Sequence, residues 1–389
     1  MPRPEPMTNL QTPPLALNDL LPALTRQLAE SAEAYDRSGD FPHANLALLQ
    51  HFGLLGLALP QALGGPGAGL GELRRVVGAV ARGEPSTALV LCMQYLHLRR
   101  LADNPGWPEA LKRRVAREAL EQGALINSLR VEPELGSPSR GGLPQTVARR
   151  DGECWRLSGH KLYTTGIPGL TWLAVWARSD EPTPRVGAWL VRRDSPGIRI
   201  VESWDHLGMR ATGSHEVIFE EVPVPLEHAV GLYPHDQPPA PDEAVLRDFA
   251  QASAALLGAL YDGIAGAARD WLLGWLRERV PASLGAPLAS LPRVQEALGA
   301  IDGLLLQNRL LLDAACRERL SASEAGLIKV AVTDNAVAVV EKALELSGNH
   351  GLSRHNPLQR HYRDVLCGRV HTPQKDSVWI AAGRAALSP

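Results

Sequence analysis

The chain is short of the residues that define several protein classes. Aromatic residues make up only 5% of its 389 residues, and it has four cysteines. The cysteines are widely spaced and show no CxxC or Cys/His pattern, so the sequence predicts neither a zinc site nor a disulfide framework. They fit reduced, buried thiols in a cytoplasmic protein. These cysteines are Cys92, Cys154, Cys316 and Cys367.

The chain also lacks an excess of charge and a long hydrophobic run. Its 40 basic and 42 acidic residues give a net charge of −2, which offers no reason to expect nucleic acid or an anionic membrane as partner. The longest apolar run, residues 88–96, contains Gln94 and is far too short to span a bilayer. Residues 1–14 are polar and proline-rich without the apolar core of a signal peptide, and we expect a flexible lead.

Three regions of different periodicity follow, which agrees with the two or three domains that this length predicts. Residues 15–123 are expected to be helical, with apolar residues at three- and four-residue intervals between Leu70 and Val80. In residues 124–228, short segments rich in β-branched and aromatic residues alternate with turn residues. Residues 241–389 carry long apolar patterns typical of a helical bundle.

The predicted fold class is therefore α+β: an N-terminal all-α domain, a middle antiparallel β-barrel or sandwich, and a C-terminal four-helix bundle. Ser86, next to Pro85, is the expected N-cap of a helix that runs to Leu101. The long helices of the bundle are expected at residues 244–280, 293–320 and 323–346.

A glycine-rich loop, RVEPELGSPSRGG, follows the first expected strand. Its glycines let backbone amides approach a ligand, although a plain surface turn is the alternative reading. The loop resembles the TEPGAGSD motif of the acyl-CoA dehydrogenase superfamily of flavoproteins, with Glu132 and Pro133 among the matches. The resemblance implies that this loop holds the pyrimidine edge and pyrophosphate of a flavin, and Val131 replaces a threonine that usually bonds the ring. The residues assigned to the flavin here are Leu129, Val131, Gly136 and Ser137.

Two further segments resemble the same family. LSGHKLYTTG is similar to its NGxKxWITN motif, which implies that Tyr163 lies beside the isoalloxazine and that Thr165 reaches the N5 and O4 edge. A core aromatic is the alternative for Tyr163. LGMRATGSHEVIFEEVPVP is similar to LGxRxSxTxxxxFxxVxVP, a pattern specific for the fold rather than the reaction. With FGLLGLALPQALGGPGAG and HNPLQRHYRD, the resemblance spans nearly the whole chain.

One residue that the family needs is missing. In the dehydrogenases a glutamate in a YEGT turn removes the α-proton while hydride passes to flavin N5, a task that suits a desolvated carboxylate. Alignment on Arg363 and Asp364 places Thr372 at that position, and a hydroxyl is too weak a base. Some members carry the glutamate on an early bundle helix, where this chain has Ser253, with Asp262 nearby as a substitute.

Two histidines are candidate catalytic residues instead. His371 stands beside the missing glutamate, where an imidazole can act as general acid or base near neutral pH. A histidine in this turn, and another on the helix that carries His97, resemble the flavin-dependent monooxygenases of the dibenzothiophene and hydroxyphenylacetate type. An ordinary, partly buried histidine is the alternative for His97.

The motifs for the nucleotide half of FAD also depart from the family. An RxxFG motif is replaced by VPASLG, with Pro281 at the arginine position and Arg279 two residues earlier, and Glu345 replaces the glutamine of QxxGGxG. We expect FAD as cofactor, with FMN or a diffusible reduced flavin as alternatives. The remaining residues assigned to the cofactor are Gly348, Asn349, Thr372 and Gln374.

The leading hypothesis is an acyl-CoA dehydrogenase-like oxidoreductase that acts on the CH–CH group of an acyl thioester. The alternatives are a reduced-flavin monooxygenase with His371 as acid or base, acting on an aromatic substrate, and a non-catalytic member that binds flavin or acyl-CoA. The resemblance implies a homotetramer or homodimer, with an electron-transfer flavoprotein or a flavin reductase as a further partner.

Overall fold

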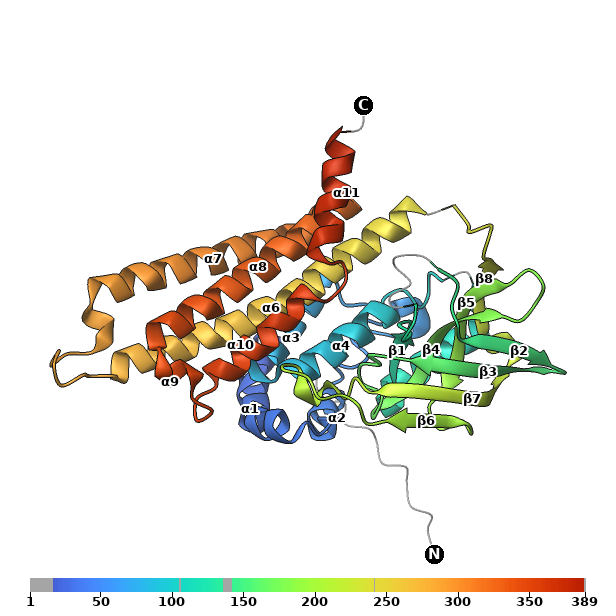
Figure 1. Ribbon diagram of the computed structural model, residues 1–389, viewed down its shortest axis with the longest axis horizontal. Coiled ribbons are helices and arrows are strands. Elements are labelled where there is room, and N and C mark those ends of the chain that lie inside the picture. The colour runs from blue at the N-terminus through green and yellow to red at the C-terminus, as the bar shows by residue number, and fades with distance from the viewer. Residues whose placement is uncertain (1–16, 105, 136–141, 241, 388–389) are drawn as a thin grey trace, which may run out of the picture.

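A computed structural model describes residues 17–104, 106–135, 142–240 and 242–387, and Figure 1 shows a bundle of long helices at one end and a sheet at the other. Gly136 and Ser137, two of the expected flavin residues, lie outside the described residues. The first helices form an N-terminal layer between bundle and sheet, and two of them, Leu17–Ser38 and Leu70–Gly83, are clearly amphipathic. They are α1 (Leu17–Ser38), α2 (His43–His51), α3 (Leu70–Gly83), α4 (Pro85–Leu98) and α5 (Glu109–Gln122).

The start of α4 differs from the prediction. Glu84, not Ser86, is the N-cap, and its buried carboxylate accepts hydrogen bonds from the backbone amides of Ser86 and Thr87. The reason is Pro85, which takes the first helical position, where its missing N–H costs nothing, and so leaves the cap to the preceding residue.

Strands among the described residues form one sheet in the order β6-β7-β3-β2-β4-β5-β8, with β1 paired to β4. Most neighbours are antiparallel, as expected, but β1 and β2 each pair with β4 in parallel, so the sheet is mixed. The purely antiparallel expectation is wrong for these two pairs, because β1 and β2 follow each other in the same direction along β4, with Leu129 opposite Val175 and Val147 opposite Arg178. The strands are β1 (Leu125–Leu129), β2 (Val147–Asp151), β3 (Cys154–Lys161), β4 (Leu170–Ser179), β5 (Arg185–Arg192), β6 (Ile198–Val201), β7 (Glu216–Pro225) and β8 (Ala229–Pro234).

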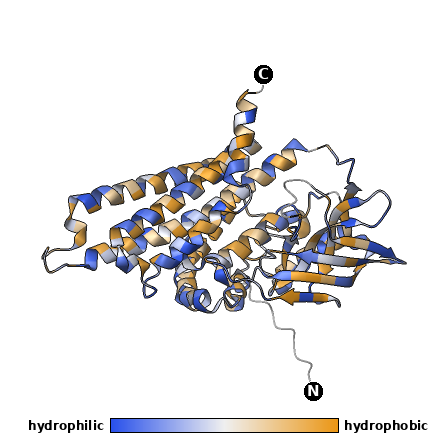
Figure 2. Cartoon of the chain, in the orientation of Figure 1, coloured by the Kyte–Doolittle hydropathy of each residue, from blue (hydrophilic) through white to orange (hydrophobic). Residues whose placement is uncertain are grey.

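The C-terminal helices confirm the predicted bundle. The central helix α6 packs against α3, α4, α7, α8 and α10, and Figure 2 shows hydrophobic and hydrophilic residues alternating along these helices. The terminal helix α11 projects away from the bundle, with only Val378 buried. None of the described helices is long and apolar enough to cross a membrane. The helices are α6 (Glu243–Glu278), α7 (Pro292–Arg317), α8 (Ala322–Ser347), α9 (Asn349–Leu352), α10 (Leu358–Leu366) and α11 (Lys375–Leu387), and the short 3₁₀ turns are η1 (Gln61–Leu63), η3 (Arg210–Thr212), η4 (Leu226–His228), η5 (Leu288–Ser290) and η6 (Cys367–Arg369).

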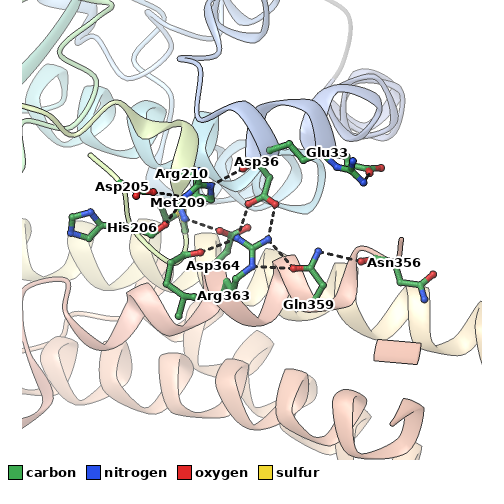
Figure 3. Close-up of polar contacts among 12 residues, drawn as sticks. Glu33, Asp36, Asp205, His206, Met209, Arg210, Asn356, Gln359, Arg363 and Asp364 are labelled. Carbon is green, nitrogen blue, oxygen red and sulfur yellow. Dashed lines mark hydrogen bonds and ion pairs between the residues drawn. The ribbon is translucent and has the colours of Figure 1, made fainter. Parts of the chain in front are cut away.

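A polar junction joins the three parts of the chain (Figure 3). Arg363 of α10 forms two hydrogen bonds to the Asp36 carboxylate of α1, at 2.6 and 2.8 Å, and donates another to the Leu207 carbonyl of the middle domain. The Met209 amide donates to the buried Asp364 carboxylate at 2.7 Å. A Cβ at Gly208 would lie 2.2 Å from the Arg363 carbonyl oxygen, so only glycine allows this approach. The junction fixes the start of the chain segment that leads from α10 to His371.

Candidate functional site

The two turns expected to hold the flavin lie side by side where β1 and β3 end. The Leu162 amide donates to the Val131 carbonyl at 2.9 Å. Directly beyond, the buried Lys161 ammonium lies 2.6 Å from the buried Glu132 carboxylate, which also accepts two backbone amides and the Thr146 hydroxyl. The ion pair holds the pKa of the Glu132 carboxyl below its usual range against the opposing effect of burial. The described part of the glycine-rich loop is therefore locked to the Tyr163 turn.

Tyr163 is presented to solvent rather than packed in the core. Its side chain is 56% exposed and its φ of 54° is in the left-handed region, which turns the chain sharply out of the sheet. Its ring makes edge contacts with Trp204 and His206, which stack on each other with ring centroids 3.6 Å apart. The alternative of a buried core aromatic is wrong, and the three rings form an open aromatic surface suited to a flat ligand.

Thr165 is held by neighbours from two elements. Its hydroxyl lies 3.0 Å from that of the buried Ser214, which in turn lies 2.8 Å from the Thr212 hydroxyl. On the other side, the Asn127 side-chain amide of β1 donates to the Thr165 carbonyl at 2.9 Å. These bonds fix a hydroxyl at the end of the Tyr163 turn, as an interaction with a flavin edge would need.

The same Asn127 connects Thr165 to His97. The His97 side chain at the end of α4 hydrogen-bonds to Asn127, and burial lowers its pKa to about 4, helped by the charges of Arg130 and Arg100. His97 is therefore neutral at physiological pH. The structure brings together His97 and Thr165, two of the predicted site residues, through a residue that the sequence analysis did not select.

His371 is held by two helices of the bundle, α6 and α8. Its Nδ1 is in hydrogen-bond contact with the hydroxyl of Tyr261, a fully buried residue of α6. Burial, together with the nearby Lys329 charge, lowers the His371 pKa to about 4. The Lys329 ammonium donates hydrogen bonds to the carbonyls of Gly368, His371 and Pro373 at 2.6–3.1 Å. These three bonds hold the backbone of the turn in place.

The other residues predicted for this turn have less restricted positions. Thr372 is exposed, and Gln374 donates to the Val370 carbonyl at 3.3 Å. Ser253 is buried on α6, so no carboxylate occupies the second position used in the family. Asp262 is not a substitute: it lines a different groove between α3, α6 and α7, where it accepts a hydrogen bond from Asn308. The expectation for Asp262 fails because its side chain leaves α6 on a different side from that of Tyr261.

Leu129 ends β1 beside the Tyr163 turn, whereas the pair Gly348–Asn349 lies apart from that turn. The Leu129 side chain is 1% exposed in the hydrophobic core, so only its backbone is available to a ligand. Gly348 and Asn349 join α8 to α9 at the far end of the bundle from the sheet (Figure 1). There His350 contacts the ring of Trp275 of α6, with centroids 5.3 Å apart. One chain does not bring Gly348 and Asn349 to the Tyr163 turn.

Within the described ranges, no group of three or more His, Cys, Asp or Glu residues is placed to hold a metal ion. The functional candidates that sequence reasoning missed are polar residues whose partners are distant in sequence, so no local motif marks them. They are Asn127, Ser214, Tyr261 and Lys329.

Three family models match the chain in order: the N-terminal, middle and C-terminal domains of acyl-CoA dehydrogenase, at residues 22–102, 131–222 and 255–375. A putative acyl-CoA dehydrogenase, YdbM of Bacillus subtilis (strain 168), is 34% identical over 90% of this chain and 91% of its own length. The chain therefore belongs to the acyl-CoA dehydrogenase family and is a flavin-dependent enzyme.

Other relatives belong to the oxygenating side of this family. L-evernosamine nitrososynthase from a Micromonospora species is 31% identical over 94% of this chain and 89% of its own. The solved structure of KijD3 in complex with FMN and a dTDP-amino-keto-sugar is 27% identical, has a TM-score of 0.81, and covers 96% of this chain and 94% of that one. Family membership alone therefore does not decide between dehydrogenation and oxygenation.

Proposed function

We propose that this protein is a reduced-flavin-dependent monooxygenase acting on a small molecule. The observation that carries the proposal is the replacement of the catalytic carboxylate. Its position holds the exposed Thr372, and the neighbouring His371 is neutral and hydrogen-bonded to Tyr261. A group with a pKa of about 4 does not match the abstraction of a weakly acidic α-proton near neutral pH. A neutral imidazole is instead suited to donating or accepting one hydrogen bond.

The contacts of His371 favour one tautomer. Burial raises the pKa of the Tyr261 hydroxyl well above its ordinary value of 10.0, so the phenol stays protonated, and we assign it as the hydrogen-bond donor to Nδ1. The imidazole proton then resides on Nε2. Because Lys329 fixes the backbone on both sides of the ring, the Nε2–H is a hydrogen-bond donor of fixed direction. We assign it the role of donating a hydrogen bond to the reacting oxygen or substrate.

The Tyr163 turn suits a flavin ring. Tyr163 and the Trp204–His206 stack supply an open aromatic surface, and Thr165 supplies a hydroxyl held by Ser214. A bound reduced flavin would supply two electrons and two protons, so that one atom of dioxygen enters the substrate and the other leaves as water. The His97–Asn127 pair next to Thr165 is neutral and adds no charge beside the Tyr163 turn.

FMN, or a reduced flavin that diffuses from a reductase, fits better than tightly held FAD. Pro281 replaces the arginine that would contact a pyrophosphate, and Glu345 places a carboxylate where repulsion would result. In support, the KijD3 relative is described in complex with FMN. We propose a flavin reductase as partner, a homotetramer as the assembly, and a cytoplasmic location.

Acyl-CoA dehydrogenation is the second candidate. It is favoured by the 34% identity to the putative acyl-CoA dehydrogenase YdbM. It requires a base that the described residues of this chain do not place at either family position, Thr372 or Ser253.

The test couples the protein to a flavin reductase and measures oxygen consumption and oxygenated product with amino sugar nucleotides and aromatic compounds. Activity in the wild type, at least tenfold lower turnover in His371→Ala, and flavin affinity within a few-fold would support the proposal. His371→Gln keeps an N–H donor and should retain more activity than His371→Ala. His51→Ala, at an exposed histidine of α2, is the control. Equal turnover of His371→Ala and wild type would refute the role of His371.

A further inference from the structure

A second cavity, far along the bundle from the Tyr163 turn, lies at the N-terminus of α10. Its volume is about 420 Å³, within the range of small-molecule sites. Residues of α1, the end of α3, α6 and the segment 354–361 line it, and Trp271 and Ala267 form its apolar wall. Arg360 and His361 line it from α10.

Arg360 is an anomaly in this cavity. Its side chain is 8% exposed, and its Nε has no hydrogen-bond partner. Among the described residues, no side-chain hydrogen bond or ion pair reaches its guanidinium. A buried guanidinium N–H without an acceptor is costly, because no protein atom replaces the water it has lost. The neighbouring buried His361 also has an Nδ1 without a partner. Each of the two side chains lining the cavity thus keeps one buried nitrogen without a hydrogen-bond partner.

The N-terminus of α10, which borders the cavity, also lacks a hydrogen-bond acceptor. α10 begins at Pro357, which offers no side-chain cap, and its first turn contains no acidic residue. The one amide oxygen in that turn, on Gln359, is taken by the Arg363 guanidinium, as Figure 3 shows. An uncapped helix N-terminus carries a partial positive charge that favours an anion.

The acidic residues nearby are mostly committed elsewhere. Asp270 pairs with Arg82, and Glu33 pairs with Arg37. Glu30 lines the cavity as an exposed residue, opposed by the exposed Arg354. The remaining charge deep in the cavity is therefore that of Arg360.

We propose that this cavity binds a phosphate group, held by the Arg360 guanidinium, the N-terminus of α10 and His361. Arginine provides the planar fork of donors that matches phosphate oxygens. The cavity is larger than an inorganic ion requires, so a small phosphomonoester fits, with its organic part against Trp271 and Ala267. This site is separate from the Tyr163 turn and does not depend on the proposed oxygenation.

Isothermal titration calorimetry of the full chain at low ionic strength tests the proposal, with inorganic phosphate, AMP and adenosine as separate titrants. We expect phosphate and AMP to bind and adenosine not to bind. AMP binding more tightly than phosphate identifies a phosphomonoester site, and equal binding identifies a site for the free ion. Binding of adenosine as tight as that of AMP, or binding of neither phosphate nor AMP, would overturn the proposal.

Variants locate the site. Arg360→Gln should weaken AMP binding at least tenfold, while Arg360→Lys, which keeps the charge but not the fork, should weaken it less. Arg26→Gln, at an exposed arginine of α1 outside the cavity, is the matched control. If Arg360→Gln fails to fold, Glu30→Gln provides the test at an exposed position, since loss of a repelling carboxylate should tighten AMP binding two- to threefold. Unchanged binding in both Arg360→Gln and Glu30→Gln would place the ligand elsewhere.

Discussion

Asp364 makes the stability of this protein depend on pH in a direction opposite to that of most carboxylates. Its carboxyl lies in the junction of Figure 3, is 4% exposed, and accepts the Met209 amide. Burial is the main cause that raises its pKa from 3.8 to about 7, and the Asp36 and Glu84 charges add to it. The folded state therefore binds a proton between about pH 4 and 7 that the unfolded chain releases, so this group destabilises the fold as pH rises through that window.

The magnitude follows from the shift. About three pKa units at about 1.4 kcal/mol each give roughly 4 kcal/mol, an upper limit that is fully developed above pH 7. Asp364→Asn keeps the oxygen that accepts from Met209 but cannot ionise. We therefore expect the variant to exceed wild type in free energy of unfolding by only about 1 kcal/mol at pH 4.5 and by up to about 4 kcal/mol at pH 8.

Urea denaturation of both proteins at pH 4.5, 6, 7 and 8 measures this difference. Only the difference between the proteins is informative, because His97 and His371 have lowered pKa values and change stability in the opposite direction. Asp236→Asn, at an exposed loop position, is the control and should show no such trend. An Asp364→Asn variant that is less stable than wild type at pH 8 would refute the assigned protonation of Asp364.

Three further predictions concern the turn and the junction. Lys329→Met should lower the free energy of unfolding by at least about 3 kcal/mol, because three backbone carbonyls lose their hydrogen-bond donor at about 1–3 kcal/mol each. A change below about 1 kcal/mol in urea denaturation would contradict this prediction. Gly208→Ala should lower the free energy of unfolding by about 1–3 kcal/mol or more, because its Cβ meets the Arg363 carbonyl. In the Gly53→Ala control the new Cβ meets no neighbour within 4 Å, although the positive φ of Gly53 adds strain of its own. Turnover should show no inflection from His371 between pH 5.5 and 8, because a pKa of about 4 leaves the ring neutral throughout; a pH profile with a midpoint near 6.5 that is lost in His371→Gln would show that the ring titrates normally.

Periodicity predicted the helices of the bundle closely because their apolar patterns are long. The expected helix at 293–320 is α7, Pro292–Arg317, and the one at 323–346 is α8, Ala322–Ser347. Strand positions followed from β-branched and aromatic clusters, but strand direction did not, because pairing of β1 with β4 depends on the path of the intervening chain. The N-cap of α4 was misplaced by two residues because proline, not the hydroxyl residue, determines the first helical position.

The candidate site was predicted only in part. Tyr163, Thr165, His97 and His371 belong to segments with family resemblance, and the structure gives each of them polar or aromatic contacts. Their partners could not be predicted, because a buried tyrosine 110 positions away from His371 leaves no pattern in the sequence. The roles of the flavin residues stay predictions, and the domain boundaries at 123, 228 and 241 do as well.

Anaerobic titration of the flavin-loaded protein with acyl-CoA thioesters of increasing chain length tests the central claim most directly. The neutral His371–Tyr261 pair and the exposed Thr372 predict that no thioester bleaches the flavin absorbance, while a chemical reductant does. Bleaching by any thioester at a rate sufficient for turnover would show that the chain dehydrogenates acyl-CoA with a base that lies outside this turn.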